Sequence, residues 1–107
     1  SVEEDAQSIK ERRNLSANGF IEVTVLITPK GNVHNRPILT FKGLPIIDKE
    51  DFTIELEEEI EKTIKTFSLI NKKQEMNLME ALKTTCRKFT KEKTGKRPFA
   101  NINLVRV

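Results

Sequence analysis

The sequence predicts an α+β fold in two layers, with a three-stranded β-sheet packed against two α-helices in the order β-β-α-α-β. Three patterns support this prediction. Residues 20–28 alternate apolar and polar side chains, as a half-buried strand does. Residues 52–70 and 78–89 repeat apolar side chains every three or four positions, as amphipathic helices do. After Gly95 and Pro98 the chain becomes apolar again and runs to its last residue as a strand.

The first two strands are separated by clear turn signals. Asn18-Gly19 precedes the first strand, whose inward face is expected to carry Ile21, Val23, Val25 and Ile27. The segment Pro29-Lys30-Gly31-Asn32 has the composition of a hairpin turn. A second strand follows within residues 33–42 and ends at Gly43-Leu44-Pro45. Because Pro37 cannot donate a ladder hydrogen bond, we expect this strand to lie at an edge or to contain a bulge.

Two amphipathic helices come next. Asp48 or Asp51 can cap the first helix, and the acidic residues of its first turns suit the positive end of the helix dipole. Its apolar stripe is Phe52, Leu56, Ile60, Ile64, Phe67 and Ile70. Asn77 with Glu80 resembles a capping box that opens the second helix after residues 71–74. That helix buries Leu78, Leu82, Cys86 and Phe89, and it ends near Thr94 before a left-handed Gly95.

The final strand is apolar on both faces. Ile102 and Leu104 share one face, and Phe99, Val105 and Val107 share the other. An apolar terminal strand of this kind is expected in the middle of a sheet or against a partner. Helices on one side leave the second face of the sheet open, and Phe20, Leu26 and Phe41 are expected to share that face with Phe99. This apolar patch predicts an interface that uses Phe99, Val105 and Val107.

Composition limits the classes of function. The net charge is +3, which is too small to indicate nucleic-acid binding, although residues 48–61 are strongly acidic and residues 83–97 strongly basic. A single cysteine cannot form an internal disulfide, so we expect a reducing, cytoplasmic environment. No apolar run is long enough for a membrane span, and no signal peptide opens the chain.

The sequence offers no cluster of catalytic or metal-ligating residues. His34 and Cys86 have no partners at ligand spacing, so we expect His34 to be a solvated turn residue and Cys86 to be a core residue. The carboxylates of residues 48–61 are expected on the solvent side of a helix. Gly95-Lys96 does not form a phosphate loop, because the upstream glycine and strand are missing. We therefore expect no catalytic residue, no metal and no cofactor in this chain.

Four basic residues near the end of the second helix can contact an RNA backbone: Arg87, Lys91, Lys96 and Arg97. The alternative is an ordinary cationic helix end, which the helix dipole favours. RNA binding by these side chains would be weak, dependent on salt and without base specificity.

Several blocks of the sequence resemble a known family. They are Arg12–Gly19, the first strand with its Lys-Gly turn, Pro37–Pro45, and Phe89–Pro98 with the strand that follows. In this order, over residues 11–107, they look like the C-terminal domain of bacterial ribonuclease J, in a form similar to that of alphaproteobacterial relatives. The Lys-Thr-x-x-Arg-Pro segment before the last strand is the most specific part.

The resemblance implies a larger parent protein. This parent is expected to be a metallo-β-lactamase-fold hydrolase with a β-CASP insertion, a zinc-dependent exonuclease and endonuclease that acts 5′ to 3′ in RNA decay and ribosomal RNA maturation. Its zinc ligands belong to an upstream His-x-His-x-Asp-His run that this chain lacks, so zinc is expected only in the parent. For the present domain, the resemblance implies a three-stranded sheet facing two helices and a supporting role in oligomer assembly.

The domain organisation and function follow as expectations. Residues 1–14 are expected to be a connector from the upstream catalytic core, and residues 15–107 the domain itself. The first hypothesis is a non-catalytic assembly domain that associates with itself or with the parent core. The second is an independent small RNA-binding module that uses the basic helix end. An assembly domain should expose apolar surface, whereas an RNA-binding module should present a continuous positive face.

Overall fold

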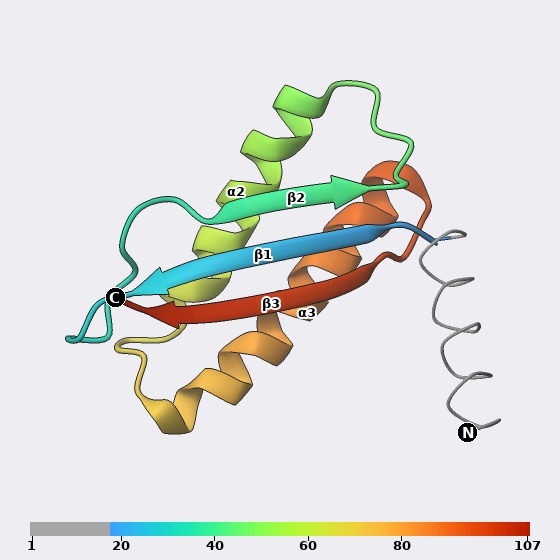
Figure 1. Cartoon of the computed structure of the whole chain (residues 1–107). Coiled ribbons are helices and arrows are strands. Elements are labelled where there is room, and N and C mark those ends of the chain that lie inside the picture. Colours follow the sequence, from blue (N-terminus) through green and yellow to red (C-terminus); the bar gives the residue numbers. More distant parts are fainter. Residues whose placement is uncertain (1–17) are drawn as a thin grey trace, which may run out of the picture.

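The computed structural model describes residues 18–107, and these form a two-layer α+β fold. Its sheet has the strand order β2-β1-β3, so the first strand is central (Figure 1). β1 runs antiparallel to β2 and parallel to β3. The strands are β1 (Phe20–Ile27), β2 (Ile38–Lys42) and β3 (Phe99–Arg106), and the helices are α2 (Lys49–Lys65) and α3 (Lys72–Thr94). The predicted fold class and element order are confirmed. The expected connector at residues 1–14 lies outside the described residues.

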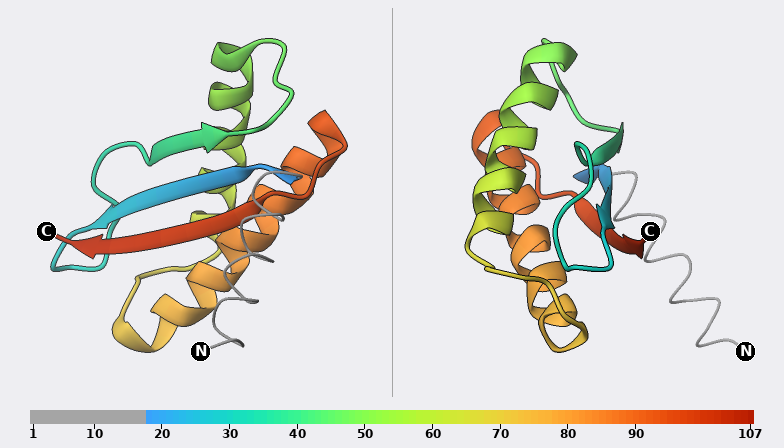
Figure 2. Two further views of the ribbon diagram at one scale, coloured as in Figure 1. Left: turned by 45° about the vertical axis from the view of Figure 1, so that its right-hand side comes forward. Right: turned by 90° about the vertical axis from the view of Figure 1, so that its left-hand side faces the viewer.

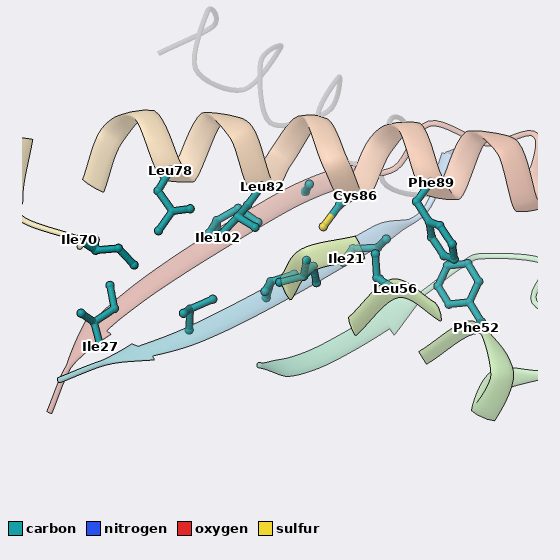
Figure 3. Close-up of a cluster of buried hydrophobic side chains, with 14 residues drawn as sticks. Ile21, Ile27, Phe52, Leu56, Ile70, Leu78, Leu82, Cys86, Phe89 and Ile102 are labelled. Carbon is teal, nitrogen blue, oxygen red and sulfur yellow. The ribbon is translucent and has the colours of Figure 1, made fainter. Parts of the chain in front are cut away.

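Both α2 and α3 cover the same face of the sheet, and no element of residues 18–107 covers the other face, called the open face below (Figure 2). The alternation in β1 is the reason: every second residue, from Ile21 to Ile27, is fully buried, and the residues between them are half-buried. The core between the layers is shown in Figure 3 and contains Ile21, Val23, Val25, Ile27, Phe52, Leu56, Ile60, Ile70, Leu78, Leu82, Cys86, Phe89, Ala100 and Ile102. The predicted stripes of α2 and α3 therefore pack on the predicted face of β1. The first helix was expected to extend to Ile70, which was wrong: α2 ends at Lys65, so Phe67 and Ile70 reach the core from the α2–α3 connection.

Three aromatic rings close one end of this core. The Phe52 ring meets the edge of Phe41, with centroids 5.2 Å apart, and it lies 5.1 Å from the Phe89 ring. Phe41 is paired with Ile21 across the β1–β2 ladder, and paired residues point to the same side of a sheet. The expectation that Phe41 lies on the open face was therefore wrong. Its register turns it toward the helices.

The helix ends use side-chain caps. Asp48 is the N-cap of α2 and accepts a hydrogen bond from the backbone N–H of Asp51, as one of the two predicted caps. The capping box of α3 is formed by Asn71 and Gln74, because each side chain accepts from the backbone N–H of the other residue. The expected box at Asn77 was wrong, since the helix begins earlier, at Lys72. Gly95 closes α3 in the left-handed conformation, with φ of 78°.

The β1–β2 turn docks on the connection between the helices. Gly31 adopts φ of 84°, and its carbonyl accepts a hydrogen bond of 2.9 Å from the backbone N–H of Ile70. A Cβ atom at Gly31 would lie 2.9 Å from the carbonyl oxygen of Ile70. The close approach requires glycine here, and it fixes the turn between the sheet and the helical layer.

The last strand lies at an edge. β3 pairs only with β1 among the described residues, so the expectation of a middle position was wrong, and the expectation of a partner remains. β2 forms the opposite edge, as Pro37 predicted. β1 is the central strand, paired with β2 on one side and with β3 on the other.

Candidate assembly and nucleic-acid surfaces

Polar side chains occupy the centre of the open face. Asn101 lies beside Glu22 in the parallel ladder, and its Nδ2 donates to the Glu22 carboxylate at 3.5 Å and to Asn103 Oδ1 at 3.4 Å. Asn103 Nδ2 in turn donates to Thr24 Oγ1 at 3.3 Å. The expected apolar patch is thus not continuous, because this ladder separates its two ends.

One end of the open face carries two stacked aromatic rings. Phe20 and Phe99 are direct partners in the ladder, and their rings are 6.1 Å apart and inclined by only 12°. Phe99 is 52% exposed, so the outer side of the pair is open to solvent. Lys42 is paired with Phe20 from the other side. An aromatic surface beside a cation therefore lies where β1 and β3 begin.

The other end of the open face is aliphatic. Leu26 and Val105 are ladder partners there, and Val107 continues the same face of the chain. Val105 is 43% and Val107 is 54% exposed. Val105 follows Phe99 by six positions, about 20 Å at the usual rise of a strand. The structure thus places the three expected interface residues on the open face, but at opposite ends.

The basic residues gather at the end of α3. Arg87, Lys91 and Arg97 line one shallow hollow of about 360 Å³, together with Thr84, Lys88 and Glu92. Lys96 is exposed and does not line it. Lys91 Nζ also donates to the Gly95 carbonyl at 3.1 Å, which satisfies the helix end. Three of the four expected RNA-contacting residues therefore meet in one place.

Acidic residues line a second hollow, on the side of α3 that faces α2. Glu55, Glu58, Glu59 and Glu92 contribute to it, with Lys88 and Lys93. Lys93 bridges the helices through a 2.9 Å ion pair with Glu55, which raises the pKa of the Lys93 ammonium group. The two sides of α3 therefore differ in charge, basic toward Arg97 and acidic toward α2.

The histidine and the cysteine lie apart from these surfaces. His34 is exposed near the β1–β2 turn, and Cys86 is fully buried under α3, as expected for both. Burial raises the pKa of the Cys86 thiol to about 12. Among residues 18–107, no three His, Cys, Asp or Glu side chains are grouped so that they could hold a metal ion.

Residues that sequence reasoning did not single out complete the open face. The sequence analysis did not recognise that Lys42, Asn101 and Asn103 lie on the same face of the sheet as the aromatic pair. The alternation of polar and apolar residues in β3 is the signal that could have found Asn101 and Asn103, because it puts them on the face of Phe99. Placing Lys42 beside Phe20 required the β1–β2 register, which only the structure gives.

Neither α2 nor α3 is sufficiently long and apolar to cross a bilayer, and this holds for all helices in the described part of the chain.

Comparisons with known proteins identify the family. A search of curated proteins found no match. The family model for the ribonuclease J C-terminal domain matches residues 7–107. Since this match spans nearly the whole sequence, the chain belongs to the ribonuclease J C-terminal domain family.

Proposed function

We propose that this chain is the non-catalytic assembly domain of a ribonuclease J-like enzyme. The family match supports a component of a ribonuclease that processes RNA. The proposed parent is a zinc-dependent metallo-β-lactamase-fold hydrolase with a β-CASP insertion, which acts on RNA as a 5′-to-3′ exonuclease and as an endonuclease in the cytoplasm. Its roles would be RNA decay and ribosomal RNA maturation.

Zinc does not fit the described residues of this chain. A catalytic zinc ion needs three protein ligands that converge, and no such group exists within residues 18–107. The metal and the catalytic groups are therefore assigned to an upstream core. The reading frame before Ser1 tests this assignment: we expect it to encode a His-x-His-x-Asp-His run, and an upstream frame without one contradicts the proposed parent.

The assembly proposal rests on the outer edge of β3, the side that faces away from β1. The N–H groups of Phe99 and Val107 donate to Gly19 and Ile27, at the two ends of the ladder with β1. In a parallel ladder alternate residues direct their backbone groups to the same neighbour. The backbone groups of Ala100, Ile102, Leu104 and Arg106 therefore point away from β1, and no described strand pairs with them. An unpaired edge of this kind is a template for another strand.

The occupant that we propose for this edge is β3 of a second copy. Two β3 strands that pair in antiparallel fashion would join two sheets into one and satisfy the outward backbone groups of both copies. Val105 and Val107, exposed on the open face, would then be covered in part by the neighbouring strand. At about 25 cal/mol per Å² of apolar surface removed from water, this burial favours association.

Sedimentation equilibrium over a range of protein concentrations tests the proposal. We expect a reversible dimer for the wild-type chain and a monomer for Val105→Lys, because an edge lysine blocks strand pairing through its charge. Met76→Lys is the matched control, since Met76 is 67% exposed and lies on α3 rather than on the β3 edge. This variant should dimerise as the wild type does.

Two outcomes contradict the assembly proposal. A wild-type chain that stays monomeric at every concentration would show that the edge does not pair with a second copy. A Val105→Lys variant with the wild-type dimerisation constant would place any dimer interface elsewhere. Circular dichroism of both variants checks that the fold is kept.

A further inference from the structure

We propose that single-stranded RNA binds where the strands β1 and β3 begin, with a base stacked on Phe99 and its phosphates along the basic end of α3. This site is distinct from the aliphatic end of the open face, where Val105 and Val107 lie. It does not depend on self-association. Four features of the described residues support it: an exposed aromatic pair, polar groups beside that pair, cations without carboxylate partners, and an acidic surface that limits the path.

The aromatic pair has the geometry of a stacking platform. The Phe20 and Phe99 rings are nearly parallel, inclined by 12°, and stacked with centroids 6.1 Å apart, so the outer face of the exposed Phe99 ring can continue the stack with a further ring. Phe99 is 52% exposed although it lies on a strand. Apolar surface in contact with water costs free energy, and a bound base ring would remove this cost by covering the Phe99 ring. Bases of single strands stack on exposed aromatic rings in this manner, whatever their sequence.

The next residues along the open face offer hydrogen bonds to the edge of a base. Asn101 and Glu22 follow Phe99 and Phe20 by two positions, so their side chains lie beside the rings on the same face. The Asn101 amide can both donate and accept, and the Glu22 carboxylate can accept from an N–H group of a base, such as the ring N–H of uracil. The 3.5 Å contact between Asn101 and Glu22 is long, so a base can compete for either group.

Some cations on α3 and near the platform form no ion pair with any carboxylate of the described residues. Lys62, Lys83, Lys93 and Arg106 each pair with a carboxylate. Within residues 18–107, no such ion pair involves Arg87, Lys91, Arg97 or Lys42. Arg97 lines the hollow at the end of α3 and precedes Phe99 by two residues, a span of about 7 Å of extended chain. It therefore links the hollow to the aromatic pair.

The acidic side of α3 limits the path of the phosphates. Glu55, Glu58 and Glu59 line the hollow toward α2 and would repel a phosphate backbone. Glu92 stands at the border of both hollows. A polyanion at Arg87 and Arg97 therefore gains by running toward Lys42 at the sheet. The arrangement places phosphates at the end of the domain and lets bases turn onto the open face.

Fluorescence anisotropy with a labelled oligouridylate tests the site through two separate readouts. Phe99→Ala should weaken binding by about tenfold and leave the salt dependence unchanged, because stacking carries no charge. Arg97→Ala should lower the slope of log K against log salt by about 0.7, the value for one phosphate contact on a single strand. Duplex RNA should bind more weakly than the single strand, since its bases are already stacked.

Each control makes the same kind of substitution as a test variant, at a residue outside the proposed site. Val105→Ala removes an apolar side chain from the other end of the same strand face, and Lys30→Ala removes an exposed cation from the β1–β2 turn. Both should bind the oligouridylate as the wild type does. Phe99→Leu keeps an apolar group without a ring and should also lose affinity.

Three results would overturn the proposal. They are equal binding of duplex and single strand, wild-type affinity in Phe99→Ala, and equal losses in Arg97→Ala and Lys30→Ala. If Phe99→Ala changes dimerisation but not RNA affinity, the aromatic pair serves a protein interface instead. Because the assembly proposal is tested by Val105→Lys in the absence of RNA, either proposal can fail while the other stands.

Discussion

The substitution Phe89→Ala should destabilise the domain by about 3 kcal/mol. Phe89 is only 8% exposed, and its ring packs at 5.1 Å on Phe52, which in turn meets the edge of Phe41. Removing a buried ring usually costs about 3–5 kcal/mol, through lost transfer energy and the cavity that remains. We expect the lower part of this range, because Lys93 lies over the ring, 5.7 Å from its centroid, and its flexible stem can move into part of the space.

Urea denaturation followed by circular dichroism measures this loss. Phe99→Ala is the matched comparison, because it makes the same chemical change at a ring that is 52% exposed. We expect a loss of about 1 kcal/mol or less there, since a half-exposed ring leaves no closed cavity. A loss below about 1 kcal/mol for Phe89→Ala, or equal losses for the two variants, would refute the assignment of Phe89 to the core.

Further predictions concern two glycines and the cysteine. Gly95→Ala should lower the free energy of unfolding, measured by urea denaturation, by about 1 kcal/mol. The φ of 78° is unfavourable for alanine, but no atom lies within 4 Å of the added Cβ. Gly31→Ala should cost more, about 3 kcal/mol, since its Cβ would also meet the Ile70 backbone; equal costs would contradict this packing. Cys86 should react with a thiol reagent only as fast as the domain unfolds, and fast labelling under native conditions would contradict its burial. Burial raises the pKa of the Cys86 thiol from 9.0 to about 12, so between these values the folded state keeps a proton that the unfolded state loses. The contribution of this thiol to the free energy of unfolding is therefore fully present below pH 9 and is lost as the pH rises toward 12. The fall in stability over this range should be steeper in the wild type than in Cys86→Ala.

Local sequence was sufficient to define the elements and the inward faces of most of them. Alternation in residues 20–27 and the three- to four-residue spacing in α2 and α3 express how a strand and a helix each present one face to a core. The stop at Gly95 and the edge position of β2 after Pro37 also follow from backbone chemistry that acts within a few residues. The meeting of Arg87 and Lys91 needed only the helix period.

Packing over long distances in the chain was needed for the rest. Phe41 faces the helices because of its register with Ile21, and the connection between β1 and β2 is too long for its sequence to set that register. The start of α3 at Lys72, capped by Asn71, was decided by the α2–α3 connection, in which Ile70 hydrogen-bonds to Gly31, because the sequence offers a second, similar capping signal at Asn77. The Phe20–Phe99 stack joins residues from opposite ends of the described chain. A parallel pair is formed only after both helices have folded back on the sheet, so no local pattern could reveal it.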